Sequence, residues 1–290
     1  MKRLKVKNDF IFQKIFGQNE HKDILISFLN AVLELEDEKK LQDLEILENT
    51  KLKRDGPDDK LGILDIRAKT LAGEQINIEV QLVNQLNMDK RTLFYWSKMF
   101  VEQLKEGQPF RNLKKTITIN ILDFDYTKLD SYNTVFHLWE DRYKDCKLTD
   151  VLEVRFIELP KFRTANFDLS KPLDRWLIFI DEPQGEALEM AIKAEPTIAK
   201  AEEILTYLGS LDEIKRYYDA REMAIHDEIS RIVDAKEEGL EEGLKKGREE
   251  GLRQSKLEIA KSMLDANMPT EQISKLTGLS TDEIEKLKNG

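Results

Sequence analysis

Two carboxylates, Asp65 and Glu79, are the side chains whose spacing first suggests chemistry. They lie in two short runs, residues 61–70 and 75–82, and the second run alternates apolar and polar side chains as a β-strand does. If Gly73 ends the intervening loop in the left-handed conformation, the hairpin register pairs Asp65 with Glu79. Directly opposed side chains lie about 5 Å apart, and two carboxylates at that distance repel by about 3 kcal/mol at an effective dielectric constant of about 20.

A fold retains two opposed acids when a bound cation, a shared proton or neighbouring basic groups stabilise them. One interpretation is a hard-cation site made of Asp65, Glu79 and a backbone carbonyl near Val80, which suits Mg²⁺. Such an ion would activate water and stabilise charge on a phosphodiester. In the other interpretation both acids face solvent, where Arg67 and Lys69 neutralise them. A loop that is one residue longer would also slip the register and weaken the contact.

The segments around this hairpin follow the order α-β-β-β-α-β, which predicts an α/β fold with a mixed sheet flanked by helices. The aromatic residues of 94–100 are expected to pack in the core. Beyond Pro160 the pattern becomes helical, with two or three helices in 186–230. The other expected elements are helices at 9–17, 22–35 and 88–106, the last closed by Gly107, and strands at 42–50, 116–122, 132–139 and 151–159.

Composition limits the class of protein. The chain has 290 residues, 40% of them apolar, and a formal net charge of −10, which excludes disordered and disulfide-stapled classes. No run approaches the length of a membrane span, and the single cysteine, Cys146, is typical of a reducing cytoplasm. Residues 1–180 hold 30 basic and 30 acidic side chains, whereas 181–230 hold 5 and 13. The neutral first part can still carry a basic groove for DNA.

Several short motifs accompany the hairpin. They are Lys7-Asn8-Asp9-Phe10-Ile11-Phe12, Ser27-Phe28-Leu29-Asn30-Ala31, Leu64-Asp65-Ile66, Ile78-Glu79-Val80-Gln81, Tyr95-Trp96-Ser97 and Leu159-Pro160-Lys161-Phe162. In their order and spacing they resemble the PD-(D/E)XK nuclease core, and more narrowly the bacterial recombination-promoting nuclease (Rpn)/transposase family. The resemblance covers nearly the whole chain, although no single motif is specific.

The resemblance implies a Mg²⁺-dependent DNA endonuclease linked to recombination or mobile elements, with Mn²⁺ as an alternative ion. Asp65 and Glu79 match the metal-binding acids of the family. A third acid, Asp9, also has a counterpart in the family and could reach the metal through the first helix. Alternatively Asp9 serves, with Asn8, as an N-terminal helix cap.

Gln81 stands where the wider superfamily has its lysine, and glutamine cannot supply the positive charge that orients and activates water. A nearby cation must replace that lysine, or catalysis is slow. Lys69 shares the appropriate face of the hairpin, and Arg91 lies on the following helix. Tyr95 lies one helical turn beyond Arg91 and shares its face.

The family resemblance divides the chain into a nuclease-like domain (1–180), an acidic helical segment (181–235) and a glycine-periodic helix with a helical tail (236–290). Residues 270–288 have the outline of a helix-turn-helix, whose acidic second helix favours a protein contact over DNA. Glycines recur at every fourth position in 236–254. This stripe either lets a second copy approach, giving a homo-oligomer through the C-terminal helices, or leaves a frayed tether.

Two functions are consistent with these features. The first is a metal-dependent DNA endonuclease. The second is a catalytically weak DNA- or protein-binding module on the same fold.

Overall fold

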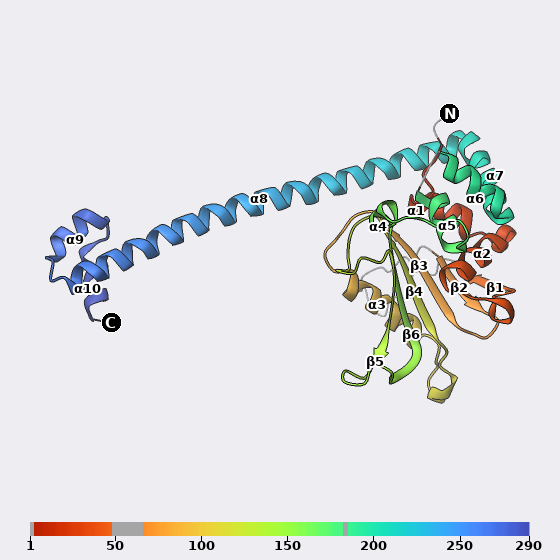
Figure 1. Cartoon of the computed structure of the whole chain (residues 1–290), viewed down its shortest axis with the longest axis horizontal. Helices are drawn as coiled ribbons and strands as arrows, with labels where there is room; N and C mark the ends of the chain where they lie inside the picture. The colour runs from red at the N-terminus through yellow and green to blue at the C-terminus, as the bar shows by residue number, and fades with distance from the viewer. Residues whose placement is uncertain (1–2, 48–65, 182–184, 290) are drawn as a thin grey trace. The chain divides into compact units, whose positions relative to one another are not determined.

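The computed structural model describes residues 3–47, 66–181 and 185–289 (Figure 1). The chain forms two compact units, Met1–His226 and Asp227–Gly290, and each is described by itself. Asp65 lies outside the described residues, as does the end of the expected strand 42–50.

A six-stranded sheet forms the centre of the first unit, in the order β1-β2-β3-β4-β6-β5. Its strands are β1 (Leu44–Leu47), β2 (Ile66–Thr70), β3 (Gln75–Gln81), β4 (Thr116–Leu122), β5 (Asn133–Trp139) and β6 (Lys147–Glu158). The pairs β3–β4 and β4–β6 are parallel and the other pairs are antiparallel. The predicted α/β fold with a mixed sheet is therefore confirmed.

The hairpin of β2 and β3 has the predicted register over its described residues, with Ile66 opposite Ile78 and Lys69 opposite Gln75. Gly73 adopts the left-handed conformation, φ +88°, and the Thr70 N–H donates to the carbonyl of Glu74 at 3.0 Å. The turn chemistry and the alternation of side chains thus fix the register together.

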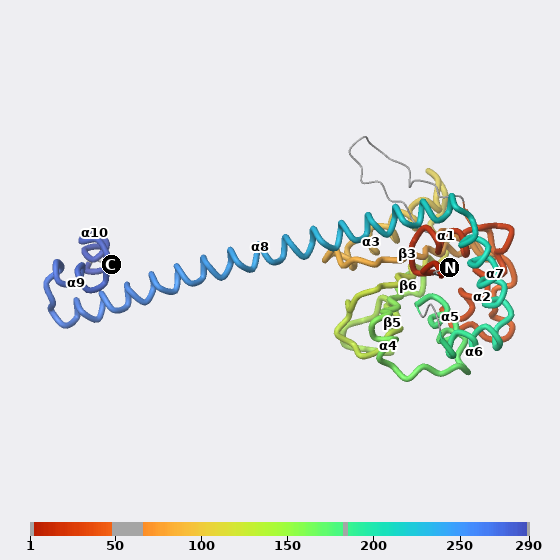
Figure 2. The backbone as a smooth tube through the Cα atoms, turned by 90° about the horizontal axis from the view of Figure 1, so that it is seen from above, coloured from red at the N-terminus to blue at the C-terminus, as the bar shows by residue number. Residues whose placement is uncertain are grey.

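One face of the sheet carries the main apolar core. The helices α1 (Asp9–Phe16) and α2 (Lys22–Val32) pack against this face. On the same side, α5 (Pro172–Asp181), α6 (Glu186–Ala194) and α7 (Pro196–Ser210) pack on these two helices and on one another (Figure 2). Stacked and edge-on rings of Phe12, Phe16, Phe28 and Trp176 fill its centre. Burial of these side chains supplies most of the hydrophobic stabilisation of this unit.

The opposite face is covered by α3 (Met88–Val101). The helix ends before the predicted 88–106, because the following chain turns back toward the sheet. There the Gln103 carboxamide donates to the Lys114 carbonyl and the Thr116 hydroxyl, at 3.1 and 2.8 Å. Gly107 still adopts a positive φ of +81°, but it ends the turn rather than the helix.

The helices beyond the sheet confirm the predicted helical C-terminal region. A short helix, α4 (Leu159–Thr164), follows β6, and α8 (Asp212–Asp265) contains the glycine-periodic residues 236–254 within one continuous helix. In the second unit the end of α8 packs with α9 (Thr270–Thr277) and α10 (Thr281–Asn289) around Ala260, Ile273, Leu279 and Ile284. Gly278, with φ +71°, makes the turn between α9 and α10, as expected for a helix-turn-helix. No described helix is long and apolar enough to cross a membrane.

Substitution of Gly73 by alanine tests the hairpin turn. The left-handed conformation is unfavourable for a residue with a Cβ, so Gly73→Ala should lower the free energy of unfolding by about 1–2 kcal/mol. Urea unfolding followed by circular dichroism measures this change. Leu71→Ala is the matched control, because Leu71 is 79% exposed in the same turn. Equal stabilities of the two variants would contradict the assignment of the turn.

Candidate active site

Glu79 lies on β3, on the face of the sheet that α3 covers, and is only 2% exposed. The Asn77 carboxamide donates to Glu79 Oε1 at 3.3 Å, and Arg91 Nε of α3 lies 3.5 Å from Glu79 Oε2. Burial raises the pKa of Glu79 above its usual value, and Arg91 and Asn77 oppose that rise. A carboxyl group in these surroundings is available either to a proton or to a cation.

The last described pair of the hairpin lies next to the position of Asp65, the second predicted acid. Because Ile66 pairs with Ile78, continuation of the ladder by one residue would place Asp65 opposite Glu79. Asp65 itself lies outside the described residues, so this pairing stays a prediction.

Arg91 is the predicted cation that the structure brings to Glu79. Its Nη1 donates to Gln85 Oε1 at 3.3 Å, and its guanidinium lies 5.5 Å from the ring centroid of Tyr95. Tyr95 is half-buried and packs against Met99. Arg91 therefore contacts the buried Glu79 carboxylate on one side and Gln85 and Tyr95 on the other.

Lys69 is exposed on β2 and pairs with Gln75, near the turn. If the observed register continues, the position opposite Glu79 lies four residues before Lys69. This separation is about 13 Å along the strand. Gln81 is half-buried at the end of β3, and strand alternation places it on the same face as Glu79. The geometry thus favours Arg91 over Lys69 as the charge beside the acids.

Asp9 occupies the first turn of α1. The sequence predicted either a metal-binding role or an N-terminal capping role for it. Asn8 is the N-cap, and its side chain accepts from the Ile11 N–H at 3.4 Å. Asp9 instead forms a two-point ion pair with Arg221 of α8, at 2.8 and 2.5 Å. A metal-binding role for Asp9 stays a prediction, and it would require competition with Arg221.

A layer of buried polar side chains lies beside Glu79 beneath α3, and sequence analysis did not identify it as part of the site. Asn120 Nδ2 donates to the Thr92 hydroxyl at 3.0 Å and to the Arg155 carbonyl at 3.1 Å. Thr92 also lies 3.2 Å from the Thr118 hydroxyl. The alternation of β4 was the available signal, because it places Thr118 and Asn120 on the same face as the polar residues of β3.

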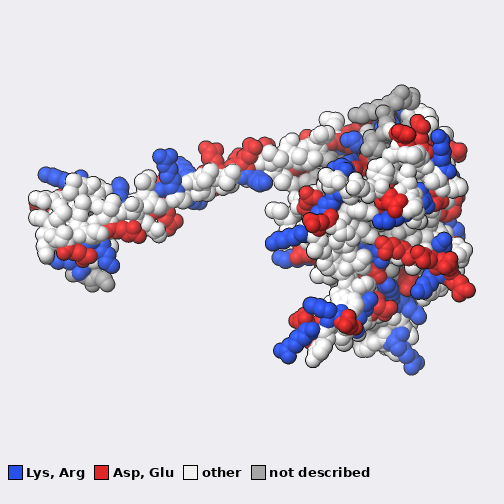
Figure 3. Space-filling view, viewed as in Figure 1, with Lys and Arg blue, Asp and Glu red and all other residues white. Residues whose placement is uncertain are grey.

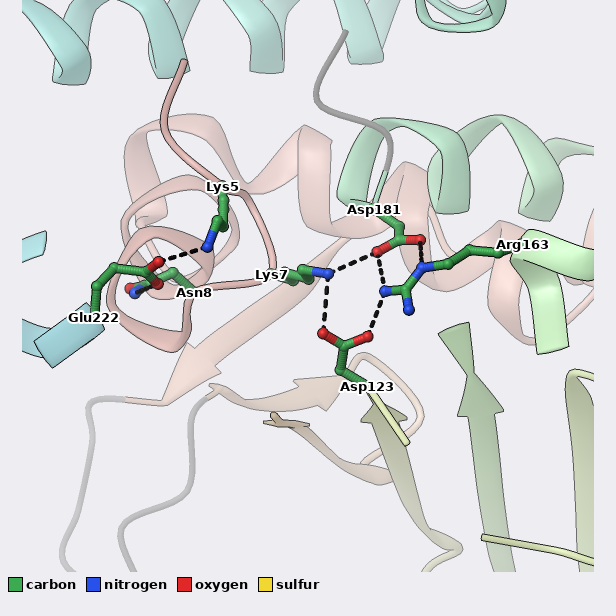
Figure 4. Close-up of polar contacts among 7 residues, drawn as sticks. All are labelled: Lys5, Lys7, Asn8, Asp123, Arg163, Asp181 and Glu222. Atoms are coloured by element: carbon green, nitrogen blue, oxygen red, sulfur yellow. Dashed lines mark hydrogen bonds and ion pairs between the residues drawn. The ribbon is translucent and has the colours of Figure 1, made fainter. Parts of the chain in front are cut away.

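A ring of ion pairs lies next to Gln81, where the Asp123 N–H donates to the Gln81 carbonyl at 2.9 Å. Lys7 Nζ lies 2.9 Å from both Asp123 and Asp181, and Arg163 closes the ring by binding the same two acids (Figure 4). Burial alone would raise the pKa of Asp181, but the hydrogen bonds from Arg163 and Lys7 hold this pKa below its usual value. The ring ties the N-terminal segment, the residue that follows β4, α4 and α5 together at this edge of the sheet.

The oxygen atoms of this region fit a hard divalent cation. Within the described residues, the buried atoms Glu79 Oε2 and Asn77 Oδ1 accept no hydrogen bond. Carboxylate and amide oxygens are ligands that Mg²⁺ takes, and this ion usually retains several waters. The described residues contain no group of three acidic, histidine or cysteine ligands, and the second expected acid is Asp65.

Comparison with known proteins agrees with this fold. Residues 6–235 match the family described as PD-(D/E)XK nuclease family transposase, and residues 253–289 match the C-terminal HTH domain of the Rpn/YhgA-like nuclease family. The searches of curated proteins and of solved structures found no match. The fold defines a protein of the PD-(D/E)XK class. The chain belongs to the PD-(D/E)XK nuclease family transposases and carries an Rpn/YhgA-like C-terminal helix-turn-helix domain.

Replacement of Glu79 by glutamine tests the burial of its charge. Glu79→Gln should raise the stability at pH 7 by about 1 kcal/mol, or about 2–4 °C in Tm, because it removes a desolvated charge. The folded protein holds the Glu79 proton more tightly than the unfolded chain does. The stability of the wild type should therefore fall as pH rises from the unfolded pKa to the raised folded pKa.

Calorimetry across this pH range measures the difference in the free energy of unfolding between Glu79→Gln and wild type. The difference should be smallest below the unfolded pKa and fully present above the folded pKa. Glu106→Gln, a change at an exposed glutamate, serves as the control and should leave the pH profile unchanged. A Glu79→Gln variant less stable than wild type at pH 7 would show that Arg91 more than offsets the desolvation.

Proposed function

We propose that this protein is a metal-dependent DNA endonuclease that acts in recombination or on mobile elements. The observation that carries the proposal is the buried carboxylate of Glu79, on the central strand of a PD-(D/E)XK sheet, with one oxygen that accepts no hydrogen bond among the described residues. The alternative is a catalytically weak binding module on the same fold.

Asp65 and Glu79 are the residues that would hold Mg²⁺, with Mn²⁺ as the alternative ion. When bound, such an ion lowers the pKa of a bound water and stabilises charge on the phosphodiester. Asn77 orients Glu79 through its hydrogen bond. We assign to Gln81 the positioning of the attacking water by hydrogen bonding, since its carboxamide carries both donors and an acceptor.

Arg91 has two roles in this proposal. Before DNA binds, its guanidinium partly neutralises Glu79 across 3.5 Å. When the site is occupied, the same group can donate to a phosphate oxygen, since planar guanidinium matches phosphate geometry. Arg91 thereby supplies the positive charge that Gln81 lacks, with Tyr95 fixing one side of its guanidinium.

Plasmid cleavage tests the proposal directly. Supercoiled plasmid is incubated with the full chain in Mg²⁺, in Mn²⁺ or in EDTA, and nicked and linear forms are separated on a gel. Wild type should nick only with metal, and Asp65→Ala and Glu79→Ala should each lower the rate by at least about a hundredfold. Glu45→Gln, at an exposed acid on the neighbouring β1, should retain full activity.

The remaining outcomes also decide between the two functions. Equal nicking by wild type and both acid variants would show that these acids do not catalyse the reaction. Intact plasmid under every divalent ion, together with retained DNA binding, would establish the binding module instead.

The second unit is proposed as an additional DNA contact. Its matched segment, 253–289, carries six basic and six acidic side chains, and both signs are also interspersed on the face shown in Figure 3. Glu283 is held in a capping box with Ser280, whose N–H donates to Glu283 Oε2 at 3.1 Å. We therefore propose phosphate contacts by the exposed Lys286 and Lys288 rather than base recognition by the acidic start of α10.

Salt-dependent binding measures this contribution. Lys286→Ala combined with Lys288→Ala should weaken duplex binding and reduce the slope of log K against log salt by about 1–2, since each lost phosphate contact removes about 0.9. Lys275→Ala, an exposed lysine on α9, is the control. An unchanged slope would assign α10 to a protein contact.

Self-association through the C-terminal helices also stays a prediction. Leu240 and Leu244 of α8 are 62% and 66% exposed, and helical periodicity places Gly247 and Gly251 on the same face. A second copy is the partner that such a small and apolar face would suit. The cytoplasm remains the expected compartment.

A further inference from the structure

A cavity of about 680 Å³ opens beside α3, and Arg91, the ion-pair partner of Glu79, lies on its wall. The described part of its wall comes from α3 and from the loop that precedes this helix, and it includes Lys90, Phe94 and Tyr95. The volume falls within the range of roughly 300–1,000 Å³ that small-ligand sites occupy. A DNA duplex cannot enter a cavity of this size, but one nucleotide can.

Phe94 gives the cavity an accessible aromatic wall. The helix was expected to bury its aromatic residues, yet Phe94 is 42% exposed. Its ring lies 5.7 Å from that of Tyr95 at an interplanar angle of 62°, and Lys98 Nζ lies 5.0 Å from the Phe94 ring centroid. Aromatic rings next to cations are the surfaces on which single-stranded bases stack.

The polar wall complements this aromatic wall. The carboxamides of Gln85 and Asn87 border the cavity, and carboxamides can bond to the edge of a base through both donors and acceptors. Lys90 and Arg91 place positive charge on the same wall. The cavity therefore offers groups for the base and the phosphate of a nucleotide: a stacking surface, amide groups for the base edge and cations for the phosphate.

Arg91 connects this cavity to the proposed catalytic acid. Its Nε faces Glu79 Oε2 at 3.5 Å, while its Nη1 donates to Gln85 Oε1 at 3.3 Å. One guanidinium thus contacts both the buried carboxylate and the cavity wall. A nucleotide that enters the cavity brings its own phosphate to the group that neutralises Glu79.

We propose that this cavity binds one unstacked base of single-stranded DNA beside the phosphate that is cut. The substrate class is then single-stranded or locally opened DNA, because a base in an intact duplex must first lose its stacking and pairing. This inference rests on the proposed nuclease function, since it assigns the substrate of the same site.

The test uses the full chain in EDTA, so that binding is measured without cleavage. The probe is a short single-stranded oligothymidylate with a central 2-aminopurine, whose fluorescence reports stacking. Wild type should change the 2-aminopurine fluorescence and bind this strand more tightly than the corresponding duplex. Phe94→Ala should abolish the fluorescence change and weaken binding about tenfold, as expected for loss of one stacking ring.

Leu93→Ala is the matched control, because Leu93 is 47% exposed on the same helix and does not line the cavity among the described residues. The control should bind as wild type does. Preference for the duplex, or equal binding by Phe94→Ala and wild type, would overturn the proposal. Equally tight binding of the matching oligouridylate would overturn the restriction to DNA.

Plasmid nicking by the same preparations separates the two proposals. If metal-dependent nicking requires Glu79 but Phe94→Ala binds the labelled strand as wild type does, the base site is wrong and the nuclease function stands. If the labelled strand stacks at Phe94 but no plasmid is cut, the cavity binds DNA without a nuclease activity.

Discussion

The contact between Glu79 and Arg91 is the interaction on which the site depends. The Glu79 carboxylate is 2% exposed and loses most of its hydration. Burial of an ion in this way costs several kcal/mol of free energy. Arg91 offsets part of that penalty while its own side chain remains 29% exposed. The pair is therefore asymmetric, with the acid fixed in the sheet and the cation partly exposed; in the proposed function this cation exchanges its partner for a phosphate.

The difference between the two faces of the sheet explains how the fold tolerates the buried carboxylate of Glu79. The face beneath α1, α2 and α5 is filled with apolar and aromatic side chains, whereas the face beneath α3 carries Glu79, Asn120 and Thr118. Marginal net stability leaves room for only a few unfavourable buried groups. The apolar face stabilises the fold, and the polar face can then retain a buried carboxylate that is unfavourable for stability.

Local rules were sufficient for the hairpin, whose described residues lie close together in the sequence. The alternation of β3 and the left-handed Gly73 predicted the hairpin register, since both constraints act within a few residues. Arg91 was a candidate because it lies on the helix that follows β3. Its choice over Lys69 needed the structure, because only the structure shows that Arg91 Nε lies 3.5 Å from Glu79 Oε2.

Long-range contacts explain what the sequence could not predict. The end of α3 depends on hydrogen bonds between Gln103 and residues that precede or begin β4, so Gly107 gave the wrong helix boundary. The ion-pair ring joins Lys7, Asp123, Arg163 and Asp181 from four separate segments, and no spacing rule relates them. Exposure of Phe94 also follows from how α3 lies on the sheet, which helix propensity does not determine.

The position of α3 links these observations into one physical account. Its inner side contacts the buried acid and the polar layer of β4, and its outer side carries the aromatic and basic wall of the cavity. Arg91 extends between these two sides and binds groups on both. In the proposed function, a phosphate would replace Glu79 as the partner of Arg91, and the acid would then lose a neutralising charge that a metal ion can supply. Binding of DNA and binding of the cation at Glu79 should therefore favour each other, since each removes the electrostatic obstacle to the other.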